Sequence, residues 1–221
     1  ISNPSDIRYG LYSGGSGRFI NNGTVFEENY QVYWCACEHN IDMWFALSTA
    51  VSLGFTQFTE RCDLVKNSIV NKLWSATDNR LYTGINEFGI DKTKYLDTSS
   101  WGGLFLLASG ELEKGKACEV FLETYRFSTI EASGYTPNLE QNRTKGIWVE
   151  GSSGAALYYR ALGKYVNNLN IIAKMRALLT PYGYRDSLID PNDKTLTLWE
   201  QSCNTAWVLL AYKPNGFMSV N

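Results

Sequence analysis

The polar and apolar positions of this chain form two kinds of helical segment that alternate along it. Segments of the first kind are apolar nearly all round, as expected of buried helices; they are residues 41–53, 99–109, 148–162 and 198–212. Segments of the second kind carry charged residues opposite an apolar stripe with steps of three to four, as expected of outer helices; they are residues 58–74, 111–126 and 166–179. This alternation predicts stacked antiparallel helical hairpins.

The pattern therefore predicts an all-α fold, an α/α toroid of stacked helical hairpins. We expect a single α/α-toroid domain over residues 1–221, in which residues 35–217 form the hairpins. Residues 1–34 are rich in glycine and aromatic residues and are expected to form a long loop with short strands. All inner helices would then run parallel, so that their N-terminal ends share one rim. The longer connections, near residues 78–97, 127–147 and 182–197, would lie at the same rim.

An acidic residue lies beside a tryptophan near the start of each inner helix. The four acids, Glu38, Asp97, Glu150 and Glu200, follow one another at intervals of 59, 53 and 50 residues. Such regular spacing indicates a repeated supersecondary unit. If the helix starts share a rim, carboxylates and aromatic rings gather there, and these are the groups from which sugar-cleaving sites are built.

Four acids are the candidate catalytic residues. Glu150 comes first, because a carboxyl in an aromatic, partly dry pocket has a raised pKa, which suits a general acid. Glu38 and Asp42 lie four residues apart on one helix face, where two carboxylates can divide acid and base roles. Asp97 is the fourth. Each has a structural alternative, since acids complement the dipole at a helix start and Asp is a favoured N-cap.

Aromatic and polar side chains near these acids are the candidate substrate-binding residues. The tryptophans could stack on sugar rings, although aromatic residues of inner helices are more often part of a core. His39 could contact substrate or form structural hydrogen bonds, and Glu200 has the same helix-start alternative as the other acids. The candidates are Trp44, Trp101, Trp148, Trp199, His39 and Glu200.

Composition excludes several classes of partner. The net charge is −2 and no basic run of five residues occurs, so a nucleic-acid footprint is absent. No apolar stretch approaches the length that spans a bilayer. Cys35, Cys37 and His39 could share one face of an extended segment as soft-metal ligands. Because His39 is the only histidine, we interpret the cysteines as buried structural thiols and expect no metal or organic cofactor. Their odd, unpatterned number favours a cytoplasmic location, while a secreted one stays open.

Together these features resemble the six-hairpin (α/α)6-barrel glycosidase superfamily, and especially its bacterial, mostly uncharacterised glycosidase-like members. The resemblance covers residues 30–217 and rests on four motifs: residues 38–42, 97–102, 148–151 and 204–217. A complete barrel has six inner and six outer helices, whereas this chain has four and three. We therefore expect an incomplete or truncated barrel, the C-terminal part of a longer protein. A further segment, a partner chain or a dimer would cover its bare helix faces.

The resemblance implies a glycoside hydrolase that acts on an oligo- or polysaccharide. One carboxylic acid would protonate the leaving oxygen while a second carboxylate acts on water or on the anomeric carbon. The alternative is a non-catalytic glycan-binding or scaffold domain, which keeps the aromatic rim without an acid–base pair. A zinc-dependent cyclase or transferase on an α/α toroid is a third reading, and the single histidine argues against it.

Overall fold

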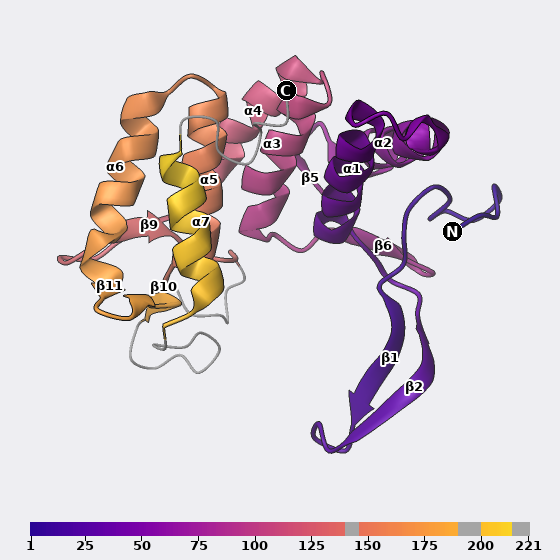
Figure 1. Ribbon diagram of the computed structural model, residues 1–221, viewed down its shortest axis with the longest axis horizontal. Helices are drawn as coiled ribbons and strands as arrows, with labels where there is room; N and C mark the ends of the chain where they lie inside the picture. The colour runs from indigo at the N-terminus through magenta and orange to yellow at the C-terminus, as the bar shows by residue number, and fades with distance from the viewer. Residues whose placement is uncertain (140–145, 190–199, 214–221) are drawn as a thin grey trace. The chain divides into compact units, whose positions relative to one another are not determined.

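The computed structural model describes residues 1–139, 146–189 and 200–213 (Figure 1). The chain divides into two compact units. Unit 1 comprises residues 1–75 and 81–93, and unit 2 comprises residues 76–80 and 94–221. The short strand β5 (Arg80–Leu81) spans the boundary between the two ranges.

Unit 1 is a helical hairpin with two small sheets. Helix α1 (Cys37–Ser52) packs against α2 (Thr59–Leu73), and the 3-10 turn η1 (Thr56–Phe58) joins them. Strands β1 (Gly15–Ile20) and β2 (Val25–Val32) form an antiparallel hairpin that projects away from these helices (Figure 1). A second antiparallel sheet has the order β3-β6-β7. Its strands are β3 (Cys35–Ala36), β6 (Gly84–Asn86) and β7 (Gly89–Asp91). Strand β4 (Trp74–Ser75) pairs with β5 in a separate two-stranded sheet.

The core of unit 1 follows from the helical spacing of its apolar residues. Val65, Ile69 and Leu73 lie at steps of four on α2 and are buried. Ile41 and Leu47 are buried on α1. These stripes face each other because each helix can remove only one side from water when it packs against a single neighbour.

Unit 2 contains two further helical hairpins and a final helix. Helix α3 (Ser100–Ala108) pairs with α4 (Leu112–Leu122), α5 (Val149–Ala161) pairs with α6 (Tyr165–Met175), and α7 (Ser202–Tyr212) packs against α5 (Figure 1). The connections contain three two-stranded antiparallel sheets, β8-β9, β10-β13 and β11-β12. The strands of these sheets are β8 (Arg126–Ser128), β9 (Ser133–Tyr135), β10 (Gly146–Trp148), β11 (Leu179–Thr180), β12 (Gly183–Tyr184) and β13 (Ser187–Ile189). The connections also contain the 3-10 turns η2 (Leu96–Thr98), η3 (Glu123–Tyr125) and η4 (Arg176–Leu178).

Small residues let the helices of unit 2 approach closely. A Cβ atom added to Gly103 of α3 would lie 2.5 Å from the ring of Tyr158 on α5, so only glycine fits there. Asn168 of α6 is fully enclosed, and its amide nitrogen donates to the carbonyls of Ala156 on α5 and Ala211 on α7, at 2.9 and 3.2 Å. One side chain therefore connects three helices.

The helices α3, α5 and α7 begin at the same end of unit 2. A Cβ atom on Gly154, in the second turn of α5, would lie 3.7 Å from Ser100 Oγ, at the start of α3. The backbone nitrogen of Val149, which starts α5, donates to the carbonyl of Asp186 at 3.0 Å. The carboxylate of Asp186 in turn accepts from Asn204 in the first turn of α7. Within unit 2 the prediction of a shared end for the inner-helix starts is thus confirmed.

The prediction of an all-α fold, an α/α toroid of helical hairpins, is wrong. Half of the structure is helical and 23% lies in several small antiparallel sheets. Apart from β1 and β2, the strands are two or three residues long and lie in the connections expected to be loops. Most pair with a neighbouring strand, and some pair with a segment distant in the sequence. Strand β10, for example, pairs with β13 about forty residues later. Segments this short carry no two-residue alternation, so the sequence pattern does not reveal them.

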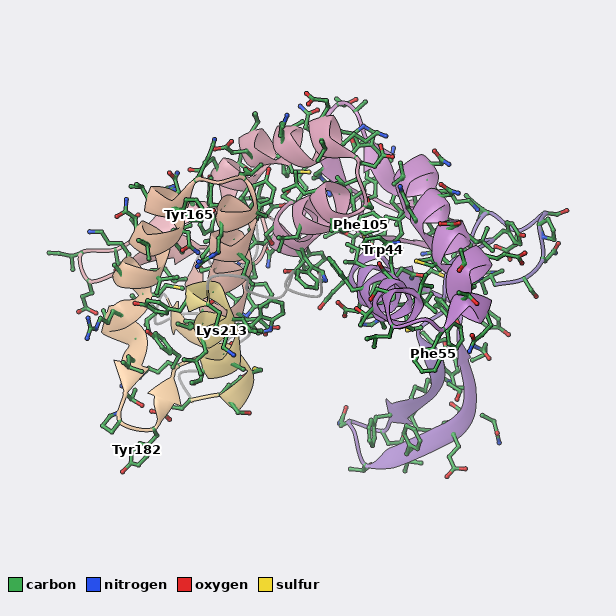
Figure 2. All side chains as sticks on the ribbon, turned by 45° about the horizontal axis from the view of Figure 1, so that its top comes forward. Trp44, Phe55, Phe105, Tyr165, Tyr182 and Lys213 are labelled. Atoms are coloured by element: carbon green, nitrogen blue, oxygen red, sulfur yellow. The ribbon has the colours of Figure 1, made fainter. Side chains whose placement is uncertain are left out.

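Helix α7 also differs from its prediction. It begins at Ser202, and its apolar residues are not buried all round: Leu209 is 59% exposed and Tyr212 51% exposed. Tyr182, in the turn between β11 and β12, projects from unit 2 as well (Figure 2). Among the described residues, no helix combines the length and apolar character needed to cross a membrane. A single domain over the whole chain stays a prediction.

Candidate functional site

In unit 1, the candidate residues cluster at the start of α1. Strand β3 leads directly into this helix, and the nitrogen of Cys37 donates to the carbonyl of Thr83 at 2.8 Å. Glu38 lies in the first turn and Asp42 one turn later, with both side chains exposed. His39 is also exposed, and its ring centre lies 6.0 Å from that of Trp34 in an edge-on arrangement. Two acids and an aromatic edge thus occupy one end of α1.

The carboxyl of Glu38 is electrostatically unusual. Although the side chain as a whole is exposed, loss of water around the carboxyl raises the pKa of Glu38. The negative charge of Asp42 raises this pKa further, and His39 acts in the opposite direction. Glu38 therefore keeps its proton to a higher pH than an ordinary glutamate, which is the property that a general acid needs.

The tryptophan and cysteines of this region are part of the protein interior. Trp44 is 7% exposed and packs edge-on against Phe45, with ring centres 5.0 Å apart. Cys35 and Cys37 are buried, and burial raises the pKa of the Cys35 thiol. No group of three or more possible metal ligands occurs among the residues that the structure describes.

In unit 2, Asp97 lies in the η2 turn that precedes α3. It is half-buried, and the N-cap of α3 is Ser99, so Asp97 does not cap that helix. Hydrogen bonds fix the turn: Thr98 Oγ1 donates to the carbonyl of Tyr95 at 2.6 Å. The fully buried guanidinium of Arg80 donates to the same Thr98 Oγ1 at 3.4 Å. The backbone that carries Asp97 is therefore held through the Thr98 hydroxyl.

Glu150 lies in the first turn of α5 and is half-buried. The ring of Trp148, also half-buried, packs on Gly151, where an added Cβ would approach the indole to 2.2 Å and Leu96 of η2 to 2.6 Å. This close contact places the start of α5 against the turn that carries Asp97. The structure thus brings Asp97 and Glu150 to the same end of the α3–α5 pair.

The other aromatic and acidic candidates of unit 2 differ in their surroundings. Trp101 is 6% exposed and packs edge-on against Trp207 of α7, with ring centres 5.3 Å apart. Glu200 is exposed and forms an isolated antiparallel bridge with Arg185 just before α7. Trp199 lies outside the described residues.

Asp186 is a buried carboxylate that the sequence analysis did not select. It is 7% exposed and follows β12, at the end where α5 and α7 begin. Its Oδ1 accepts from Asn204 Nδ2 at 3.3 Å, and its carbonyl accepts from Val149, the residue before Glu150. The only sequence signal was its position in a long connection before an inner helix. Asp186 is an additional acid beside the start of α5.

Comparison with known proteins identifies the fold. No family model matches this chain, and a search of curated proteins found no match. Two solved structures are similar over nearly all of it. A GH76 α-mannanase of Bacteroides thetaiotaomicron matches 97% of this chain and 64% of its own, with a TM-score of 0.62 and 13% identity. A D-mannose isomerase matches 96% of this chain and 59% of its own, with a TM-score of 0.64 and 14% identity.

Both similar structures have (α/α)6-barrel-type, glycosidase-like folds. At this level of identity, the likeness concerns the fold. The chain spans about three fifths of the length of either structure.

Proposed function

We propose that this protein is carbohydrate-active and hydrolyses glycosidic bonds of an oligo- or polysaccharide. The observation that carries the proposal is the placement of Asp97 and Glu150 at one end of the α3–α5 pair, in a fold similar to that of an α-mannanase. An acid that serves only the helix dipole needs no burial, whereas both of these side chains are half-buried. A pair of carboxyls in such surroundings suits glycoside hydrolysis.

In this mechanism, Glu150 is the general acid. Its proton passes to the leaving oxygen of the glycosidic bond, and Asp97 acts as the second carboxylate, on water or on the anomeric carbon. Glu38, whose pKa is raised, and Asp42 form a second, separate candidate acid pair within unit 1. Half-buried Trp148 is proposed to contact the sugar at the unit 2 site, and exposed His39 is proposed to do so at the unit 1 site.

The test uses isosteric variants that keep the side-chain shape and remove the proton or the charge. Glu150→Gln and Asp97→Asn should each lower hydrolysis about 10²–10⁴-fold if they form the acid–base pair. Glu113→Gln is the matched control, because its side chain is 88% exposed on α4 and pairs only with Lys116. Product release from α-mannan, neutral β-glucans and their oligosaccharides is measured by chromatography. Full activity of both variants would move the roles to Glu38 and Asp42.

Sugar isomerisation is a second candidate, supported by the similarity to a D-mannose isomerase. It transfers a proton between carbons of one free sugar and releases no shorter chain. Incubation with D-mannose, followed by separation of ketose from aldose, distinguishes it from hydrolysis. A protein that binds oligosaccharides but performs neither reaction would be the non-catalytic glycan-binding or scaffold domain.

We also propose that a further segment, a partner chain or a second copy covers one side of α7. Ala206, Leu209 and Tyr212 recur at steps of three along the helix and are exposed, which is unusual for an apolar stripe. Sedimentation of the protein with and without Leu209→Glu tests the dimer. A monomer in both cases would exclude a second copy on this face.

A further inference from the structure

The β1–β2 hairpin of unit 1 carries aromatic side chains without forming a core. None of the residues of its two strands is buried. Phe19 and Phe26 are 69% and 52% exposed, and side chains project from both faces of the hairpin (Figure 2). A cross-strand aromatic pair stabilises a hairpin by about 0.2–1 kcal/mol, and the large exposed area of these rings is open to a further role.

The hairpin is nevertheless built as a defined structure. Asn21, Asn22 and Gly23 have positive φ angles of 51°, 54° and 85°, which the turn requires. On one face, Arg18 pairs with Glu27 at 2.7 Å. The same guanidinium lies 3.9 Å from the ring centre of Tyr30. These contacts hold the strands in one register.

The opposite face presents an aromatic platform. Phe19 and Phe26 are direct cross-strand partners, with ring centres 5.0 Å apart. A Cβ atom on Gly17 would lie 2.3 Å from the ring of Phe26, so this ring rests over the glycine backbone. Because Phe26 is still half exposed, one side of its ring lies against the strand and much of the remainder is open to solvent.

The surroundings of the platform are polar but nearly uncharged. In residues 13–33 the charged residues are Arg18, Glu27 and Glu28, and the single cation is already ion-paired. Amide and hydroxyl side chains fill the other polar positions; they are Ser13, Ser16, Asn21, Asn22, Thr24, Asn29 and Gln31. Open ring faces beside neutral donors and acceptors match the CH faces and hydroxyl groups of a neutral sugar chain, and the remaining acid disfavours an anionic polymer.

The hairpin also leads directly to the candidate site of unit 1. The nitrogen of Gly14 donates to the carbonyl of Trp34 at 2.9 Å, which closes the base of the hairpin. Trp34 contacts His39, the neighbour of Glu38 at the start of α1. A polymer held by the hairpin would therefore reach the end of α1 where the two acids lie.

We propose that the Phe19–Phe26 platform binds neutral polysaccharide and extends the candidate site along the chain of its substrate. This inference rests on the proposed carbohydrate activity and specifies a long neutral polymer as the substrate class. The occupant is a glycan chain rather than a second copy of the protein.

Affinity electrophoresis in gels that contain α-mannan, a neutral β-glucan or polygalacturonate tests the proposal. The wild type should be retarded by a neutral polymer, and Phe19→Ala/Phe26→Ala should bind that polymer about tenfold more weakly. Val25→Ala is the matched control, since Val25 is 44% exposed, apolar and adjacent to Phe26 on the other face. Phe26→Trp keeps a ring at the platform and should retain binding, which a mere effect on folding would not produce.

Several outcomes would overturn the proposal. These are equal binding by the double variant and the wild type, retardation by polygalacturonate alone, or no retardation by any neutral polymer. A dimer that the double variant converts to monomer in sedimentation would make a second copy the occupant. Hydrolysis of the same polymers is scored in parallel. A wild type that is retarded but cleaves nothing would refute the hydrolase and leave the binding platform standing.

Discussion

A half-buried hydrogen-bond cluster around Glu123 should make an important contribution to the stability of unit 2. Its Oε1 accepts from the hydroxyls of Tyr135, at 2.7 Å, and Tyr159, and Arg126 donates to both carboxylate oxygens. The two tyrosines are 0% and 1% exposed. Glu123→Ala would therefore remove the acceptor that two buried hydroxyls share.

The magnitude follows from these contacts. An unsatisfied buried hydroxyl costs about 1–3 kcal/mol, while the exposed part of the Arg126 pair contributes about 0–1 kcal/mol. The Glu123 side chain is 38% exposed, so water can replace part of the lost acceptor. We expect a loss of about 2–4 kcal/mol of unfolding free energy, or a melting temperature lower by about 5–15 °C for a chain of this size.

The assay is thermal and urea unfolding, followed by circular dichroism, with Glu113→Ala as the control. Glu113 forms a similar ion pair with Lys116 at 2.8 Å, but its side chain is 88% exposed and contacts no buried hydroxyl. The control should change stability by less than about 0.5 kcal/mol. If Glu123→Ala and Glu113→Ala proved equally stable, the argument from buried donors would be refuted.

The pH dependence provides a second check. Burial raises the pKa of Glu123, but the hydrogen bonds from Arg126, Tyr159 and Tyr135 outweigh it, and the net pKa is lowered. The stabilisation is therefore fully present above the ordinary glutamate pKa of about 4.3. It is lost as the pH falls through the lower, folded-state value. The difference between wild type and Glu123→Ala should be constant from pH 6 to 8 and shrink in strong acid.

Two further predictions need no substrate. Burial and the charge of Asp42 raise the pKa of Glu38, so ionising this group lowers the stability of the protein as the pH rises through the folded-state pKa. Glu38→Gln should therefore raise the melting temperature at pH 7 and leave it unchanged near pH 3. A lower melting temperature of the variant at pH 7 would contradict the predicted direction. Gly103→Ala should lower the free energy of unfolding by about 1–3 kcal/mol, since the added Cβ would lie 2.5 Å from Tyr158. Gly154→Ala should be neutral or stabilising, because the nearest neighbour of its added Cβ lies at 3.7 Å. Denaturant titrations of both variants measure the difference.

The helices were predictable because their cores need a regular apolar spacing. Residues 37, 100 and 149 start helices close to the predicted positions. The outer helices α2 and α4 fall within the predicted ranges, and α6 begins one residue before its predicted range. The short strands were not predictable, because two or three residues carry no local alternation of polar and apolar positions. Pairs such as β10 and β13 depend in addition on a distant partner. The long β1–β2 hairpin was expected only as a loop with short strands.

The candidate site was predictable in part, because the regular apolar spacing that reveals the helices also reveals where they begin. Helix starts can be located in the sequence, so Glu38 and Glu150 were placed in first turns correctly. Burial is a tertiary property, and a tryptophan in an inner helix, such as Trp101, gives no sequence signal of how deeply it packs. Asp186 was missed because its partner Asn204 lies 18 residues away on another element. The roles of these residues in catalysis stay predictions.

The pairing of β10 with β13 joins two connections of unit 2, so that the paired segments cannot move independently. Gly146, Ile147 and Trp148 are in register with Ile189, Leu188 and Ser187, and Val149 is tied to Asp186 beyond the last pair. A residue inserted within either strand would break this register and shift the first turn of α5. Loop variation, the usual route by which a helical scaffold acquires a new specificity, is therefore constrained here to paired changes. Variants selected for altered specificity should carry compensating substitutions in both segments.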